Sequence, residues 1–92
     1  MNGQTEKQIH EVTLKDRSEM RITGVCEVES FDDTSVIMRT VRGDMTVEGR
    51  ELRVDVLDVE RGVVTLRGQI GGIFYSTEDG EEKRGFFGRL FR

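Results

Sequence analysis

The sequence contains no proline and no tryptophan, and it has one cysteine, one histidine and one tyrosine. A disulfide needs two thiols, so Cys26 has no partner within the chain, which is typical of a protein from a reducing compartment. His10 is the only histidine, and it lies among polar residues near the N-terminus. Neither a histidine-based metal site nor a catalytic triad is therefore expected within one chain.

Long apolar runs are also absent. No stretch approaches the ~20 consecutive apolar residues that cross a bilayer, and the first fourteen residues, MNGQTEKQIHEVTL, contain no apolar segment of a secretory signal. A chain of 92 residues has room for one core, so we expect one domain in the cytoplasm.

The candidates for chemistry are few. A free cysteine is most often a small buried hydrophobe, and this is our expectation for Cys26. Asp55, Asp58 and Glu60 could gather at one loop, but their spacing matches no known cation-binding loop. The pair Gly71–Gly72 lacks the spacing of a phosphate loop. The sequence predicts no catalytic, cofactor-binding or metal-binding residue, and it does not indicate an enzyme.

What the sequence does have is alternation of apolar and polar residues from position 9 onward, which is typical of strands. Polar clusters at 15–19 (KDRSE), 32–35 (DDTS), 42–44 and 60–62 predict turns, and glycines punctuate the rest. We therefore expect an all-β fold of about seven or eight short strands, sandwich-like or a partly open barrel. A pattern ending in glycine recurs in MRITG, MTVEG and VTLRG, which leaves a short β-solenoid as the alternative.

Charge divides the chain. The first 82 residues carry all eighteen acidic residues against ten basic ones, whereas the last ten carry four basic residues and no acidic one. An acidic body repels phosphate backbones, so nucleic acid is not an expected partner. The resulting organisation is a flexible N-terminus at 1–8, a β domain at 9–76, a charged linker at 77–83 and an amphipathic tail at 84–92.

The tail is the candidate binding site. On a helix, its four apolar residues occupy one arc of about 140°, opposite the cationic face. Such a short helix is marginal in water, so it should form only against a surface: its own domain, a partner protein or an anionic membrane. The charged linker lets the tail extend away from the domain, so we favour docking to a partner protein or a membrane over packing on its own domain. The predicted docking residues are Lys83, Arg84, Phe86, Phe87, Arg89, Leu90, Phe91 and Arg92.

Several segments, in order, resemble the YabP/YqfC family of sporulation proteins. They are ITGV (22–25), VESFDD (28–33), GDMTVEGRELRV (43–54), LDVERGVV (57–64) and GFFGRLFR (85–92). The resemblance implies a protein made in the mother cell of an endospore-forming bacterium and needed for assembly of the spore's protective layers, the cortex among them. It implies no enzymatic activity and no cofactor, and it supplies no established site residues.

The resulting hypothesis is a non-catalytic structural or adaptor protein, peripheral at the outer forespore membrane. Its tail would dock to a membrane protein of the sporulation machinery or to the anionic membrane surface. The alternative is a homo-oligomeric β scaffold, in which an edge strand such as 36–41 or 63–76 pairs between subunits and the tail packs on its own or a neighbouring subunit.

Overall fold

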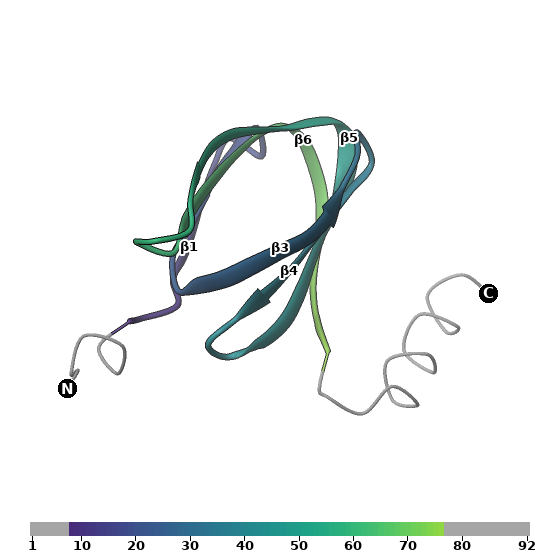
Figure 1. The fold of residues 1–92 in the computed structure, drawn as a ribbon. Coiled ribbons are helices and arrows are strands. Elements are labelled where there is room, and N and C mark those ends of the chain that lie inside the picture. The colour runs from purple at the N-terminus through teal and green to yellow at the C-terminus, as the bar shows by residue number, and fades with distance from the viewer. Residues whose placement is uncertain (1–7, 77–92) are drawn as a thin grey trace, which may run out of the picture.

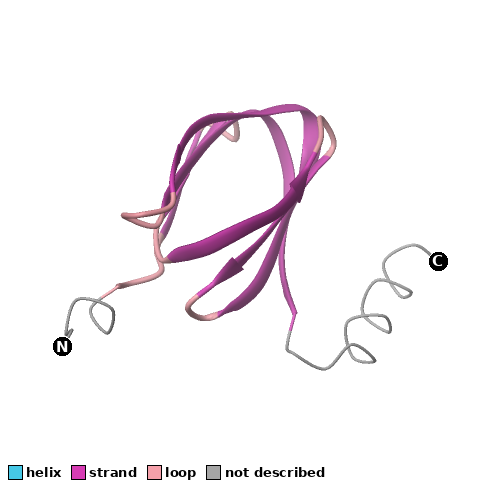
Figure 2. Ribbon diagram, in the orientation of Figure 1, coloured by secondary structure: helices cyan, strands magenta, loops and turns pink. Residues whose placement is uncertain are grey.

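Six antiparallel strands form one sheet over residues 8–76, which are the residues described by the computed structural model (Figure 1). The order of the strands across the sheet is β1-β2-β6-β5-β4-β3. Figure 2 shows only strands and loops in this part of the chain. The strands are β1 (Val12–Lys15), β2 (Glu19–Ile22), β3 (Val25–Phe31), β4 (Ser35–Thr40), β5 (Gly43–Asp58) and β6 (Val63–Ser76).

The all-β prediction is confirmed, but the expected number of short strands is wrong because β5 and β6 run through glycines that were expected to end strands. At Gly49 and near Gly68 the register between β5 and β6 shifts, and the ladder resumes on the other side. Every pairing in this sheet is antiparallel, which argues against the solenoid alternative. The predicted C-terminal helix lies outside the described residues.

The register shifts bend β5 and β6 together. A Cβ atom at Gly49 would lie 1.9 Å from the carbonyl oxygen of Gln69, and one at Gly68 would lie 2.5 Å from that of Glu51. Gly68 also has a φ of 138°, a conformation that residues with side chains rarely adopt. Glycine at these two positions therefore allows the backbones to approach closely while the strands turn.

The bend divides the sheet into two halves. Residues 43–48 of β5 pair with β4, whereas residues 53–58 pair with the first part of β6, which also pairs with β2. Alternate side chains from both halves meet in one apolar core. The backbone of the two halves forms an arch (Figure 1). The core residues are Met20, Ile22, Val25, Val36, Met38, Met45, Val47, Leu52, Val64, Leu66 and Ile70.

The predicted turn at 32–35 forms around the carboxylate of Asp32. This carboxylate accepts hydrogen bonds from the amides of Thr34 and Ser35, at 2.8 and 2.9 Å, and from the Thr34 hydroxyl at 3.0 Å. The bond from the Thr34 amide contributes most, and together the bonds lower the pKa of Asp32 below its usual value of 3.8.

We predict that Gly49→Ala lowers the free energy of unfolding by at least about 2 kcal/mol, because the new Cβ collides with a backbone oxygen that can move only if the bend opens. Urea denaturation followed by circular dichroism measures the change. The control is Gly71→Ala, whose added Cβ would lie 3.5 Å from its nearest neighbour, an ordinary contact. Equal stability of the two variants would contradict this account of the bend.

Asp32→Asn is expected to destabilise the protein most at neutral pH, where the wild-type carboxylate is ionised. Since the folded-state pKa is lowered, the stabilisation is present above pH 3.8 and is lost as the pH falls through the folded value. The difference in urea midpoint between wild type and variant should therefore shrink in acid. Asp33→Asn is the control, because the Asp33 carboxylate receives no hydrogen bond within residues 8–76. A difference that is constant with pH would contradict the prediction.

Candidate docking surfaces

The predicted docking residues, from Lys83 to Arg92, all follow Ser76, the last residue that the structure describes. Their conformation and contacts therefore remain predictions. The described residues show the surfaces that surround the base of the tail, and these surfaces decide what the tail could meet on its own domain.

At the base of the tail, Tyr75 is tied to the N-terminal segment. The Nδ1–H of His10 donates to the Thr23 carbonyl at 2.9 Å, which leaves Nε2 to accept from the Tyr75 hydroxyl. The two rings meet edge to face, with centroids 5.5 Å apart. His10 is thus a structural link between chain segments 65 residues apart, and no local pattern in the sequence indicates this pairing.

A shallow depression of about 700 Å³ lies at the bend. Its lining combines Arg17 and Arg50 with the carboxylate of Glu48 and the ring of Phe74. The ring lies over Gly72, where a Cβ would be 2.8 Å from its Cζ atom. Among residues 8–76 no group of three or more His, Cys, Asp or Glu side chains could hold a metal ion. The lining thus combines both signs of charge with hydroxyl groups and an aromatic ring.

The second surface lies between the free edge of β3 and the free edge of residues 53–58 of β5. We call this surface the seam. The seam is closed at both ends by backbone hydrogen bonds, from the Val25 amide to the Gly62 carbonyl (3.0 Å) and from the Leu52 amide to the Asp33 carbonyl (2.9 Å). Between these points, the ladders found in the described part of the chain pair β3 only with β4 and residues 53–58 only with β6. In Figure 1, β3 and the arch of β5 accordingly meet at their ends and diverge between them.

Apolar side chains line the seam. Phe31 and Leu57 pair in register with the buried residues Val36 and Val64, so they belong to the core-facing side of the sheet. They are nevertheless 58% and 49% exposed, because no strand lies beyond them. The sequence showed both strands but could not show that their edges are free, since strand order is a property of the tertiary fold.

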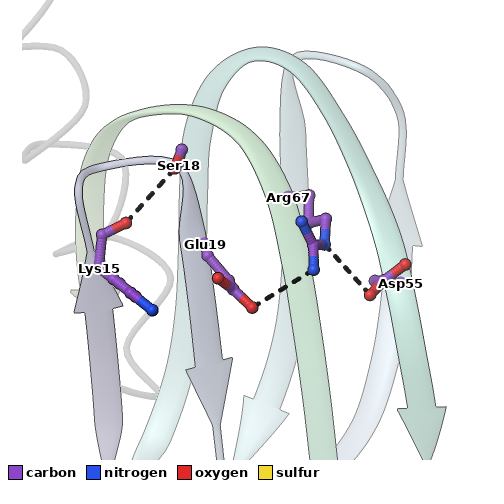
Figure 3. Close-up of polar contacts among 5 residues, drawn as sticks. All are labelled: Lys15, Ser18, Glu19, Asp55 and Arg67. Carbon is purple, nitrogen blue, oxygen red and sulfur yellow. Dashed lines mark hydrogen bonds and ion pairs between the residues drawn. The ribbon is translucent and has the colours of Figure 1, made fainter.

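Charges around the bend are paired across strands. Arg67 contacts Glu19 at 3.5 Å and Asp55 at 3.3 Å (Figure 3), and Arg39 bridges Glu27 and Glu29 on β3. All these side chains are at least one-third exposed, so each pair contributes at most about 1 kcal/mol. Their effect is to fix side chains in place rather than to form a cation site.

Cys26 corrects the sequence analysis. It was expected to be buried, but it is exposed on β3. Cys26 directly follows the buried Val25, so alternation along the strand places it on the opposite face of β3, which is exposed at this position. The sequence could not show that no other segment covers this face.

Tyr75 is expected to titrate above the ordinary pKa of 10.0, because partial burial disfavours the phenolate. It is the only tyrosine and the chain has no tryptophan, so absorbance at the phenolate band reports this group alone. Since the folded-state pKa is raised, its contribution to stability is present below pH 10 and is lost as the pH rises through the folded value. The chain unfolded in urea is the control, and identical midpoints in the two states would contradict the prediction.

No helix within residues 8–76 is long and apolar enough to cross a membrane. The sequence model of the YabP family matches residues 6–82. A relative, Spore protein YabP of Bacillus subtilis (strain 168), is 40% identical over 84 residues, which cover 90% of this chain and 84% of the relative. The match spans the whole described sheet, including its bend and both edges of the seam. The chain therefore belongs to the YabP family, a family of sporulation proteins.

Proposed function

We propose that this protein is a non-catalytic structural or adaptor component in assembly of the spore cortex or envelope at the forespore membrane, and that it docks through residues 83–92. The observation that carries the proposal is the cationic, phenylalanine-rich tail that follows an acidic β domain. Membership of a sporulation family supports the cellular setting. The exposed apolar side chains at the seam, among them Phe31 and Leu57, suit binding.

The tail suits an anionic surface for two reasons. Its four cations each contribute up to about 1 kcal/mol near such a surface, and phenylalanine and leucine side chains add apolar burial in the interface. The domain itself is repelled by anionic lipid, since it is acidic. Docking by one tail is therefore weak and reversible, and firm attachment requires a membrane protein partner or several copies acting together.

A homo-oligomeric scaffold is the second candidate, and the free edges of the seam favour it. One of the edges nominated from the sequence needs correction, however. Segment 36–41 overlaps β4, which lies between β3 and β5 and so has no free edge. The first part of 63–76 lies between β2 and β5, but residues 71–76 pair only with β5 in the ladders of the described residues. Pairing between subunits would use β3, the second half of β5 or residues 71–76 of β6, and sedimentation of the purified chain without lipid tests for it.

The docking proposal predicts that Arg89→Glu with Arg92→Glu weakens binding to vesicles rich in anionic lipid by at least about tenfold, because each reversal removes an attraction and adds a repulsion. Co-sedimentation with the vesicles measures the loss. The matched control, Arg21→Glu with Arg42→Glu, changes net charge equally at two exposed arginines whose side chains have no partner among residues 8–76.

The same variants, tagged with a fluorescent protein, separate a membrane role from a role in the cortex. In sporulating cells the tail variant should lose its position at the forespore membrane and fail to support the cortex. The control should keep its position and support the cortex. Normal localisation of the tail variant would contradict docking through residues 83–92.

A further inference from the structure

The seam is an incomplete part of the sheet. The backbone groups that β3 and residues 53–58 of β5 direct away from their partners have no ladder partner in the described part of the chain. Open edges of this kind are normally covered, because they invite pairing with other chains. The bonds at Val25–Gly62 and Leu52–Asp33 hold the two edges at both ends, so the opening is a fixed feature of the fold.

The lining defines what fits there. Phe31 and Leu57 face the core side but are about half exposed, and Val28 and Val54 beside them are only partly buried against the core. A segment that covers these four side chains must itself be apolar. Together the four form a strip that continues the core outward between the two edges.

The charge of the seam further limits which kind of segment can occupy it. The segments that border it, 25–33 and 53–58, contain one arginine against six carboxylates, four of which contact Arg39, Arg61 or Arg67. The side chains of Asp32 and Asp33 lie at one end without a cationic partner in the structure described. The seam therefore favours an occupant with positive charge on one side and apolar side chains on the other. The carboxylates are Glu27, Glu29, Asp32, Asp33, Asp55 and Asp58.

One segment of the chain has this chemistry and can reach the seam. Residues 85–92 contain four apolar side chains and two arginines. The path from Ser76 crosses Asp44 and Arg39 to Glu27 on β3, in register, which is three strand spacings or about 14 Å. The eight residues 77–84 span up to about 26 Å when extended, so the segment reaches the seam with length to spare.

We propose that residues 85–92 of the same chain occupy the seam, with their apolar side chains over Phe31 and Leu57 and their arginines near the carboxylates of both edges. The inference goes beyond the proposed function and does not depend on it, since it concerns the tail when nothing else is bound. If the tail also docks elsewhere, the partner must compete with the seam for it. The acidic seam and an anionic surface attract the tail by the same chemistry.

Hydrogen exchange of the full-length protein tests the proposal. In wild type, amides of β3 and of residues 53–58 should exchange at least about tenfold more slowly than in Phe87→Asp with Leu90→Asp, because only wild type retains the apolar tail that covers both edges. The protection should be the same across a wide range of protein dilution. Equal exchange in the two proteins would show that the tail does not cover the seam, and protection that grows with concentration would assign the seam to a second copy; either result overturns the proposal.

A change within the seam provides the reciprocal test. Leu57→Glu should raise exchange in residues 85–92 and along β3, whereas Val59→Glu, at a similarly exposed position in the β5–β6 turn, should leave both unchanged. Phe31→Glu is a second seam variant with the same expectation, should the first fail to fold.

Vesicle binding distinguishes the two proposals. If the wild-type protein shows slow exchange at the seam but does not bind vesicles, this inference holds and lipid docking is excluded. If the protein binds vesicles but its seam edges exchange rapidly, lipid docking holds and this inference is excluded.

Discussion

At the bend of the central hairpin, the backbone at Gly49 lies so close to the carbonyl of Gln69 that a Cβ atom would not fit, and Gly68 meets Glu51 in the same way. This close approach lets two long strands turn together without losing their pairing on either side. The core depends on it, because Met45 and Val47 from one half of the sheet meet Leu66 and other residues from the other half only if the sheet folds over.

The same bend creates the open edges. Residues 43–48 of β5 lie between two strands, but beyond the bend residues 53–58 leave β4 behind and keep only β6. β3 is at the end of the strand order and likewise keeps one partner. The two unpaired edges are held opposite each other by the bonds at their ends. A single constraint of the backbone thus produces both the core and the apolar, acidic seam beside it.

The domain and the tail differ in the sign of their charge. Arg39 and Arg67 contact carboxylates on neighbouring strands, yet carboxylates remain in excess over the basic residues of the domain. The four cations of the last ten residues offset half of this excess. A domain and a tail of opposite charge attract each other, and each also selects its other partners by charge. This relation connects the proposed docking role with the proposed resting place of the tail.

The amino-acid sequence by itself determined the strand class, four of the turns, the segregation of charge and the amphipathic character of the last residues. These are local properties, set by alternation, by turn-forming side chains and by composition. The tertiary structure decided three further features: whether Gly49 ends a strand or bends it, whether Cys26 is buried, and which strand edges remain open. Each depends on what a distant segment places beside the residue, which is the carbonyl of Gln69 at Gly49 and no covering strand at Cys26 or at the open edges.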